Sequence, residues 1–204
     1  SQEPDTGAQD SAHERHARML LAGADALEAA GYLHVGVDVF AQPDDPLLAA
    51  QRRGRLYRDA LGFGAHGATH LVGFGVGAIS QLGGCYAQNP LDQAGWEARI
   101  DQGHRAAERG VELGDDDHLR AAILQHILCF GRIDVAQLEN HHRIDFRDYF
   151  ADALGRLQPL FEDGSLAWSK EAIHFDRLAR LTSQAIASQF DPLLVTGAGS
   201  TASR

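Results

Sequence analysis

The stretch best suited to holding a ligand in this 204-residue chain is the apolar run Gly75-Val76-Gly77-Ala78-Ile79-Ser80. Glycine has no Cβ atom, so a ligand or a second stretch of backbone can approach the chain closely at such positions. The run has two interpretations. It is either a binding site built from Gly75, Gly77, Ala78 and Ile79, or a glycine-containing core strand that binds nothing.

A second group with possible chemistry is the basic run Arg52, Arg53, Arg55 and Arg58, at the end of a predicted helix. A guanidinium group presents a fork of N–H donors that matches a carboxylate, so the run is suited to an anion that carries carboxylates. The alternative is a solvated helix end, which is the commoner use of exposed charge.

Asp38 stands near the end of the apolar stretch YLHVGVDVF, which predicts a buried strand. Functional side chains of α/β barrels lie at the carboxyl ends of the strands, so Asp38 is a candidate to line a site. A carboxylate that caps the next segment is the alternative.

The chain offers no set of side chains for a metal ion. Its two cysteines, Cys85 and Cys129, are far apart and cannot supply the ligands of a zinc or iron–sulfur site. His66 and His70 are four residues apart, but Gly67 argues against a helix there and no third ligand is near. We therefore predict no metal ligand and no catalytic acid or base within this chain.

Composition limits the partners and the compartment. The chain carries 18 Lys and Arg against 28 Asp and Glu, a formal net charge of −10, whereas nucleic-acid binding needs concentrated positive charge. No apolar stretch is long enough to span a membrane, and the polar first residues do not form a signal peptide. Free cysteines fit a reducing compartment. We predict a cytoplasmic monomer that binds neither nucleic acid nor membrane.

The elements that would position these residues indicate an α/β fold. Residues 13–31 have helical apolar spacing and precede the strand YLHVGVDVF, and a helix followed by a buried strand is the unit of a parallel sheet. Residues 44–56 are predicted to be helical. The stretch LVGFGVGAI predicts a second buried strand, and LDQAGWEARIDQGHRAAERG predicts an amphipathic helix.

After about residue 111 the pattern is mostly helical. HLRAAILQHILCF, VAQLENHH and FRDYFADALGRLQPLF each predict a helix, the last with Asp145 as its N-cap. SLAWS and IHF predict a small hairpin, and LARLTSQAIASQF predicts a final helix. Three helices with a hairpin outline a winged helix. The predicted parts are a disordered tail at 1–12, an α/β part at 13–110, a winged-helix-like domain at 111–192 and a disordered tail at 193–204.

Four stretches, in this order and spacing, resemble one known family. GVDVFAQPDDPLLAAQRRGRLYR and LVGFGVGAISQLGGCYAQN are similar to the region after the catalytic barrel core of the oxygen-independent coproporphyrinogen III oxidases. RAAILQHILCFGRID and DYFADALGRLQPLFEDGSL resemble the C-terminal domain of that family. The resemblance covers about residues 13–192. It implies the C-terminal portion of such an enzyme: the end of a radical S-adenosylmethionine (βα) barrel, followed by the helical domain.

The resemblance also implies a reaction of heme biosynthesis. Family members use a reduced [4Fe–4S] cluster to split S-adenosylmethionine, and the resulting 5′-deoxyadenosyl radical removes hydrogen from two propionates of coproporphyrinogen III. Loss of carbon dioxide leaves the vinyl groups of protoporphyrinogen IX. Three cysteines of a C-x-x-x-C-x-x-C loop hold the cluster. This chain lacks that loop, so we expect it to be inactive alone and to act as part of the whole enzyme.

Carried over residue by residue, the resemblance implies that Ile79 contacts S-adenosylmethionine, with Gly75, Gly77 and Ala78 as its neighbours. The adenine face would pack on aliphatic carbon while its edge bonds to strand backbone. The propionates of the substrate would be held by the arginine run, and Asp38 would line the substrate site.

Departures from the family's pattern leave a second interpretation open. The family usually has G-x-D-H-F where this chain has Gly36-Val37-Asp38-Val39-Phe40, and N-F-Q-G-Y at residues 59–63. The usual C-N-F-R is here Cys129-Phe130-Gly131-Arg132. The alternative is a diverged relative that binds heme or porphyrin without oxidase activity. A third interpretation, a winged-helix regulator, is weakened because the helix at 146–161 is not basic.

Overall fold

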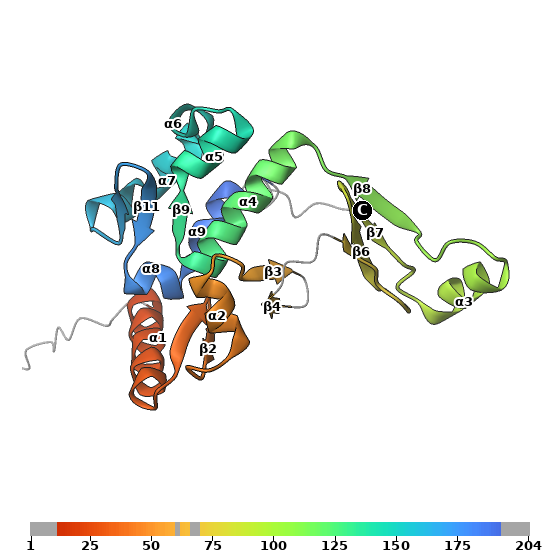
Figure 1. Cartoon of the computed structure of the whole chain (residues 1–204), viewed down its shortest axis with the longest axis horizontal. Coiled ribbons are helices and arrows are strands. Elements are labelled where there is room, and N and C mark those ends of the chain that lie inside the picture. Colours follow the sequence, from red (N-terminus) through yellow and green to blue (C-terminus); the bar gives the residue numbers. More distant parts are fainter. Residues whose placement is uncertain (1–11, 60–61, 66–69, 193–204) are drawn as a thin grey trace, which may run out of the picture. The chain divides into compact units, whose positions relative to one another are not determined.

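Figure 1 shows the computed structural model of the chain, which describes residues 12–59, 62–65 and 70–192. The disordered tails predicted at both ends lie outside these residues, apart from Ala12, where the first helix begins. Among the described helices, none combines the length and the apolar character that crossing a membrane requires.

Contacts in space divide the chain into two compact units. The first unit contains residues 1–65 together with 123–204, and the second contains residues 66–122. The predicted parts at 13–110 and 111–192 follow the order of the chain and remain predictions.

Aspartate side chains begin many of the helices. The described helices are α1 (Ala12–Ala29), α2 (Pro46–Arg52), α3 (Gln93–Asp101), α4 (Asp115–Phe130), α5 (Val135–His142), α6 (Phe146–Tyr149), α7 (Ala151–Glu162), α8 (Arg177–Leu181) and α9 (Ser183–Ala187), with the 3-10 turn η1 (Ser188–Phe190). Five helices are preceded by an aspartate whose carboxylate accepts a hydrogen bond from a backbone N–H of the first turn. This N–H has no acceptor within the helix itself. These N-caps are Asp45, Asp92, Asp134, Asp145 and Asp176. The predicted N-cap at Asp145 is confirmed.

Every strand pair among the described residues is antiparallel. The strands are β1 (Leu33–Gly36), β2 (Val39–Ala41), β3 (Tyr57–Asp59), β4 (Gly62–Gly64), β5 (His70–Leu71), β6 (Ile79–Leu82), β7 (Cys85–Gln88), β8 (Arg109–Glu112), β9 (Arg132–Asp134), β10 (Leu166–Trp168) and β11 (Ala172–Phe175). They form the pairs β1-β2 and β3-β4, the sheet β5-β6-β7-β8 and the sheet β10-β11-β9. The chain therefore mixes α and β structure as predicted, but the described strands do not form the predicted parallel unit.

The stretch YLHVGVDVF shows why that prediction is wrong. It forms the hairpin β1-β2 and not one strand, because Val37 takes a left-handed conformation with φ of 52° and turns the chain back. A bond of 2.8 Å between Nε2 of His34 and the carbonyl oxygen of Val37 supports the turn. A short apolar run has the same sequence pattern whether it forms one strand or a tight hairpin, so the pattern could not distinguish these two structures.

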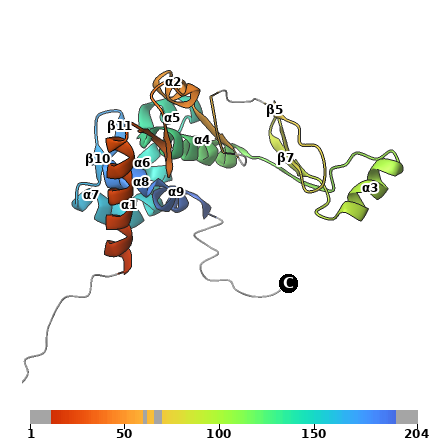
Figure 2. The same cartoon turned by 90° about the horizontal axis from the view of Figure 1, so that it is seen from below.

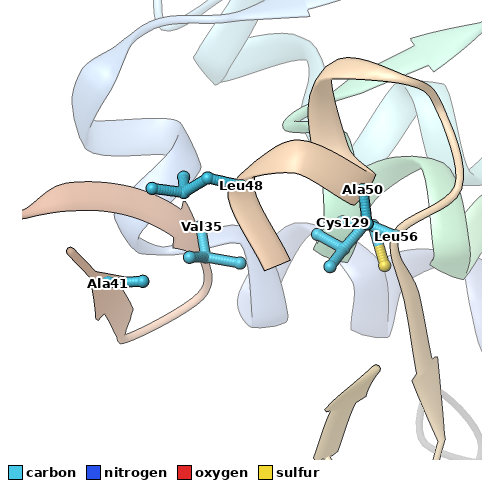
Figure 3. Close-up of a cluster of buried hydrophobic side chains, with 6 residues drawn as sticks. All are labelled: Val35, Ala41, Leu48, Ala50, Leu56 and Cys129. Atoms are coloured by element: carbon cyan, nitrogen blue, oxygen red, sulfur yellow. The ribbon is translucent and has the colours of Figure 1, made fainter. Parts of the chain in front are cut away.

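One apolar cluster of the first unit is built from segments that lie far apart in the sequence. Figure 3 shows its buried members, which are Val35, Ala41, Leu48, Ala50, Leu56 and Cys129. The side-chain amide of Gln51 donates to the carbonyl oxygens of Val35 and Cys129, the second at 2.9 Å. A Cβ atom on Gly36 would collide with the backbone oxygen of Leu128. Helix α4 and hairpin β1-β2 therefore pack backbone against backbone at this point.

The rest of the first unit has an aromatic core. Phe146 is fully buried and lies against Phe150, Phe190 and Trp168, with ring centroids 5.0, 6.3 and 6.5 Å away. The predicted hairpin is confirmed as β10-β11. The predicted final helix is instead interrupted, and forms α8, α9 and η1.

Helix α1 is tied to the start of α8, and the two lie side by side in Figures 1 and 2. One nitrogen of Arg177 lies 2.6 Å from a carboxylate oxygen of Asp25 and 3.0 Å from one of Glu28. All three side chains are exposed, so this network adds little to stability but sets which helix faces meet.

The second unit contains the four-stranded sheet β5-β6-β7-β8, with α3 in the connection from β7 to β8 (Figures 1 and 2). The predicted buried strand LVGFGVGAI is wrong: the chain leaves β5 after Leu71 and re-enters the sheet only at Ile79, and Phe74 between them is 90% exposed. The predicted helix at 91–110 is shorter than expected, because α3 ends at Asp101 and β8 begins at Arg109.

Replacement of Phe146 by Ala should lower the free energy of unfolding by about 3–5 kcal/mol, because it leaves a cavity in a closed aromatic core. Denaturant titration followed by circular dichroism measures the change. The matched control is Phe74→Ala, which removes the same atoms from a side chain that is 90% exposed. Equal losses in the two variants would contradict the assignment of Phe146 to the core.

Candidate functional site

The predicted ligand-binding run lies in a folded segment, residues 73–79, which we call the glycine loop. Gly75 and Gly77 have φ values of 99° and 68°, a region that side-chain-bearing residues rarely adopt. The N–H of Gly73 donates to Oγ of Ser80 at 3.0 Å, which joins the two ends of the loop. A Cβ atom on Gly73 would lie only 2.5 Å from the carbonyl oxygen of Ile79. Glycine is therefore required for the shape of this loop at several positions.

The residues that follow β7 hold the glycine loop by its backbone. The N–H of Gly77 donates to the carbonyl oxygen of Pro90 at 2.7 Å, and the N–H of Asn89 donates to that of Ala78 at 3.0 Å. Ile79 then pairs with Gln88 in the β6-β7 ladder. These bonds continue the strand pairing past the end of the sheet and into the loop.

Two side-chain amides complete the attachment. Asn89 is only 5% exposed, and its Nδ2 donates to the carbonyl oxygen of Gly75 at 2.8 Å. Nε2 of Gln88 donates to the carbonyl oxygen of Gly77 at 3.2 Å. Oε1 of Gln88 accepts from two nitrogens of Arg109, at 3.0 and 2.7 Å, which fixes the orientation of the amide.

Apolar side chains surround this polar attachment and face solvent. Phe74, Val76, Ile79 and Leu91 are 90%, 43%, 39% and 66% exposed. A planar ring needs an apolar surface for its face and backbone groups for its edge, and the glycine loop supplies both next to each other. The geometry thus suits an adenine group, while the contact itself remains a prediction.

The predicted anion-binding residues lie in the first unit. Arg52 is the last residue of α2, exposed Arg55 lies in the connection to β3, and Arg58 lies in β3 with its guanidinium 5.6 Å from the ring centre of Phe63. Asp38 is exposed in the turn between β1 and β2, and so does not follow a parallel strand as expected. Their role in binding remains a prediction, and they belong to a different unit from the glycine loop.

Neither cysteine belongs to a metal site in the described part of the chain, where no group of three His, Cys, Asp or Glu side chains is placed to hold an ion. Cys129 is fully buried, and its thiol donates to Oε1 of Gln125 at 3.3 Å. Burial raises the pKa of Cys129 to about 12, so the thiol stays protonated, whereas iron is held by thiolates. The chain has only two cysteines in all, fewer than a cluster needs.

Two partly buried histidines have structural contacts. Burial lowers the pKa of His34, and the nearby positive charge of Arg180 lowers it further. Burial likewise lowers the pKa of His126, whose Nδ1 accepts the backbone N–H of Asp134 at 3.2 Å. Both rings are therefore neutral at pH values where an ordinary histidine begins to protonate, and neither belongs to the glycine loop.

Known proteins are similar to this chain in sequence over most of its length. The oxygen-independent coproporphyrinogen III oxidase of Pseudomonas aeruginosa is 38% identical over 176 residues, which are 86% of this chain and 38% of that protein. That of Escherichia coli is 38% identical over 168 residues, which are 82% of this chain and 37% of that protein. No family model matches the chain.

A solved structure is also similar to this chain in its fold. It is described as "Coproporphyrinogen III oxidase (HemN) from Escherichia coli is a Radical SAM enzyme", and it matches with a TM-score of 0.80 and 35% identity over 89% of this chain and 42% of that chain. Over most of its own length, the chain is therefore similar in sequence and fold to oxygen-independent coproporphyrinogen III oxidases. It spans less than two-fifths of the length of the two curated oxidases named above.

The sequence analysis selected residues of the glycine loop as a candidate site but overlooked the residues that hold the loop. Gln88 and Asn89 lie in the stretch CYAQN, which was used only as part of the resemblance. Two adjacent amide side chains at the end of a strand, followed by Pro90, are the sequence signal that could have identified Gln88 and Asn89. Proline cannot donate to a ladder, so side chains must supply donors where a strand ends in this way.

The two cysteines should react at very different rates. At about pH 8, a thiol with a pKa of about 12 is a thiolate in only about one molecule in ten thousand, and Cys129 is also fully buried, whereas Cys85 is half-buried. Iodoacetamide should therefore label Cys85 of the native chain and leave Cys129 unmodified, as measured by peptide mass spectrometry. Labelling in denaturant, where both thiols should react, is the control. Rapid labelling of native Cys129 would contradict its burial.

Proposed function

We propose that this chain acts as part of an oxygen-independent coproporphyrinogen III oxidase of heme biosynthesis. The complete enzyme would remove two propionate carboxyl groups of coproporphyrinogen III oxidatively and leave the vinyl groups of protoporphyrinogen IX. The observation that carries the proposal is the match in both sequence and fold, 38% identity and a TM-score of 0.80, to proteins of that name.

The contribution of this chain to cosubstrate binding would come from the glycine loop. Ile79 would meet the adenine face of S-adenosylmethionine, and Gly75, Gly77 and Ala78 would let the ring approach the backbone. The support is the exposure of Ile79, at 39%, beside left-handed glycines. When bound, S-adenosylmethionine and a [4Fe–4S] cluster supply the oxidising chemistry of radical enzymes.

The cluster itself does not fit this chain. Its ligands would have to come from residues outside these 204, because the two cysteines are too few and Cys129 is a buried, protonated thiol. We therefore assign no catalytic residue and no metal ligand to the chain, and expect the isolated chain not to turn over substrate.

On the substrate side, Arg52, Arg55 and Arg58 are the candidates for contact with the propionates of coproporphyrinogen III, and Asp38 is a candidate to line the substrate site. Arg52 and Arg55 are exposed, and one nitrogen of Arg52 donates to the carbonyl oxygen of Pro43 at a long distance of 3.4 Å. Their guanidinium groups are thus accessible to carboxylates.

The finer architecture is part of the proposal. We assign the end of a radical S-adenosylmethionine barrel to the first half of the chain and a winged-helix-like domain to the second. The order of α4, β9, α5, α6, α7 and the hairpin β10-β11 supports the second assignment. A small-molecule substrate, a cytoplasmic location and a monomeric state stay predictions from the sequence.

A diverged relative that binds heme or porphyrin without oxidase activity is the second candidate. The observation that favours it is Val39, which stands where the family usually has histidine and packs against the apolar cluster of Val35 and Leu48. A polar position of the family has become part of a core here.

A winged-helix regulator is disfavoured by the basic residues of α6 and α7. The guanidinium of Arg147 lies 3.8 Å from the ring centre of Trp168. Arg156 donates to Oε1 and to the carbonyl oxygen of Gln189, at 2.9 and 2.6 Å. Both arginines thus make contacts within the chain, whereas a recognition helix presents such groups to DNA.

The test is turnover by the native protein that contains this chain, purified without oxygen and supplied with coproporphyrinogen III, S-adenosylmethionine and a reductant. Ile79→Glu should lower the specificity constant for S-adenosylmethionine at least about tenfold, because a charge would replace the apolar contact. Chromatography of the oxidised porphyrin products measures the rate.

The matched control is Ile100→Glu, since Ile100 lies in α3 of the same unit and is 46% exposed. Its activity should equal that of the unmodified protein. Porphyrin binding without any decarboxylation by the native protein would favour the diverged binding relative. Equal loss of activity in both variants would contradict the assignment of Ile79.

A further inference from the structure

We propose that Asn89 is a positioning residue, whose buried side-chain amide holds the glycine loop in the conformation that presents Ile79 to the cosubstrate. The inference rests on the cosubstrate contact proposed above and extends it to a residue that would not touch the ligand. Asn89 lies after β7, outside the segment 73–79 that would form the contact.

The burial of Asn89 requires an explanation. Among the described residues, the buried polar side chains are those of Asn89 and Ser183, at 5% and 1% exposure. Burial of an amide is unfavourable unless its groups are hydrogen-bonded. Asn89 donates two hydrogen bonds to the loop: its backbone N–H donates to the carbonyl oxygen of Ala78, and Nδ2 donates to that of Gly75. One residue thus grips the loop at two points, three positions apart.

Hydrogen bonds within the glycine loop contribute little to keeping its conformation. Within it, the N–H of Ala78 reaches the carbonyl oxygen of Gly75 only at 3.4 Å. Gly75 and Gly77 have φ values of 99° and 68°, and glycine has more conformations to lose than any other residue. External donors must therefore select the observed conformation, and Asn89 supplies the bond to Gly75 while Gln88 supplies the one to Gly77.

The hydrogen bond from the backbone of Asn89 lies next to Ile79, the residue proposed to contact the cosubstrate. The carbonyl that the N–H of Asn89 bonds belongs to Ala78, the residue before Ile79. A loop held in its binding conformation does not lose conformational freedom when the ligand arrives, so its affinity is higher than that of a loose loop. Asn89 would act on affinity for the cosubstrate through the loop, and not through contact with the ligand.

The sharpest variant is Asn89→Asp, which keeps the shape of the side chain and exchanges the donor for a carboxyl group. An ionised carboxylate cannot donate to the carbonyl oxygen of Gly75 and places a negative charge against it. The protonated acid can donate again. Binding by this variant should therefore be weak at neutral pH and recover as the pH falls, since protonation restores the donor.

The measurement is binding of S-adenosylhomocysteine, a stable analogue of the cosubstrate, to the native protein that contains this chain, purified without oxygen, by calorimetry. At about pH 7.5, Asn89→Asp should bind at least about tenfold more weakly than the unmodified chain. Burial beside the carbonyl oxygen of Gly75 disfavours the ionised carboxyl and raises its pKa above the ordinary value of about 3.9, so at about pH 4 the ratio of the two affinities should return to within about threefold. The unmodified chain is titrated at each pH, so titration of other groups cancels in the ratio. Hydrogen exchange at the Gly77 N–H should be faster in the variant only at the higher pH.

The matched control is Asn140→Asp, because Asn140 is exposed in α5 of the other unit and the same exchange there should leave affinity unchanged. Equal affinity of Asn89→Asp and the unmodified chain at both pH values would overturn the inference but not the cosubstrate site. A variant that is unfolded at both pH values would show that Asn89 supports the sheet as a whole, which also overturns it. Absence of binding by the unmodified native protein would instead count against the cosubstrate site itself.

Discussion

Side-chain amides donate hydrogen bonds to backbone carbonyl oxygens in both units of this protein, and these bonds hold segments that are distant in the sequence. In the second unit, Asn89 and Gln88 donate to the carbonyl oxygens of Gly75 and Gly77. Without these bonds, a glycine-rich segment has no reason to keep one conformation, since glycine resists ordering more than any other residue. The shape of the glycine loop therefore depends on residues that follow the next strand.

The same device joins distant parts of the first unit. The amide of Gln51 bridges the carbonyl oxygens of Val35 and Cys129, and Gln125 both accepts from the N–H of Arg58 and donates to its carbonyl oxygen, at 2.9 and 2.5 Å. An unsatisfied buried amide destabilises a fold more than a satisfied one stabilises it. These glutamines thus specify how α2, α4 and β3 meet, while apolar contacts such as that of Leu48 supply most of the free energy.

The chemistry assigned to the chain is binding and not electron transfer. The glycine loop offers an apolar surface next to backbone groups, and the arginines of the first unit offer guanidinium groups, whereas the buried thiol of Cys129 is unsuited to a cluster. A chain that spans 38% of a related oxidase would carry part of the binding surface, with the cluster-binding cysteines elsewhere in the complete enzyme.

The sequence by itself determined what depends on neighbours along the chain. It predicted helix α5 over VAQLENHH, the N-cap at Asp145 and the hairpin β10-β11, because caps, turns and 3.6-residue spacing act over a few residues. The order of four stretches also identified the family. Composition singled out the run at residues 75–80, but it left open whether the run was a binding site or a core strand.

Tertiary structure decided the pairing of the strands and the conformation of the loop. An apolar run such as YLHVGVDVF predicts burial but not the partner, so the parallel sheet was wrong, and the turn at Val37 is visible only once the backbone is traced. The left-handed angles of Gly75 and Gly77 are set by Asn89 and Pro90, which contribute through hydrogen bonds and not through pattern. The spacing of residues along a chain indicates which side chains share a face of a helix or strand. It does not indicate which distant donor will bond a given backbone carbonyl, because that depends on how the elements pack.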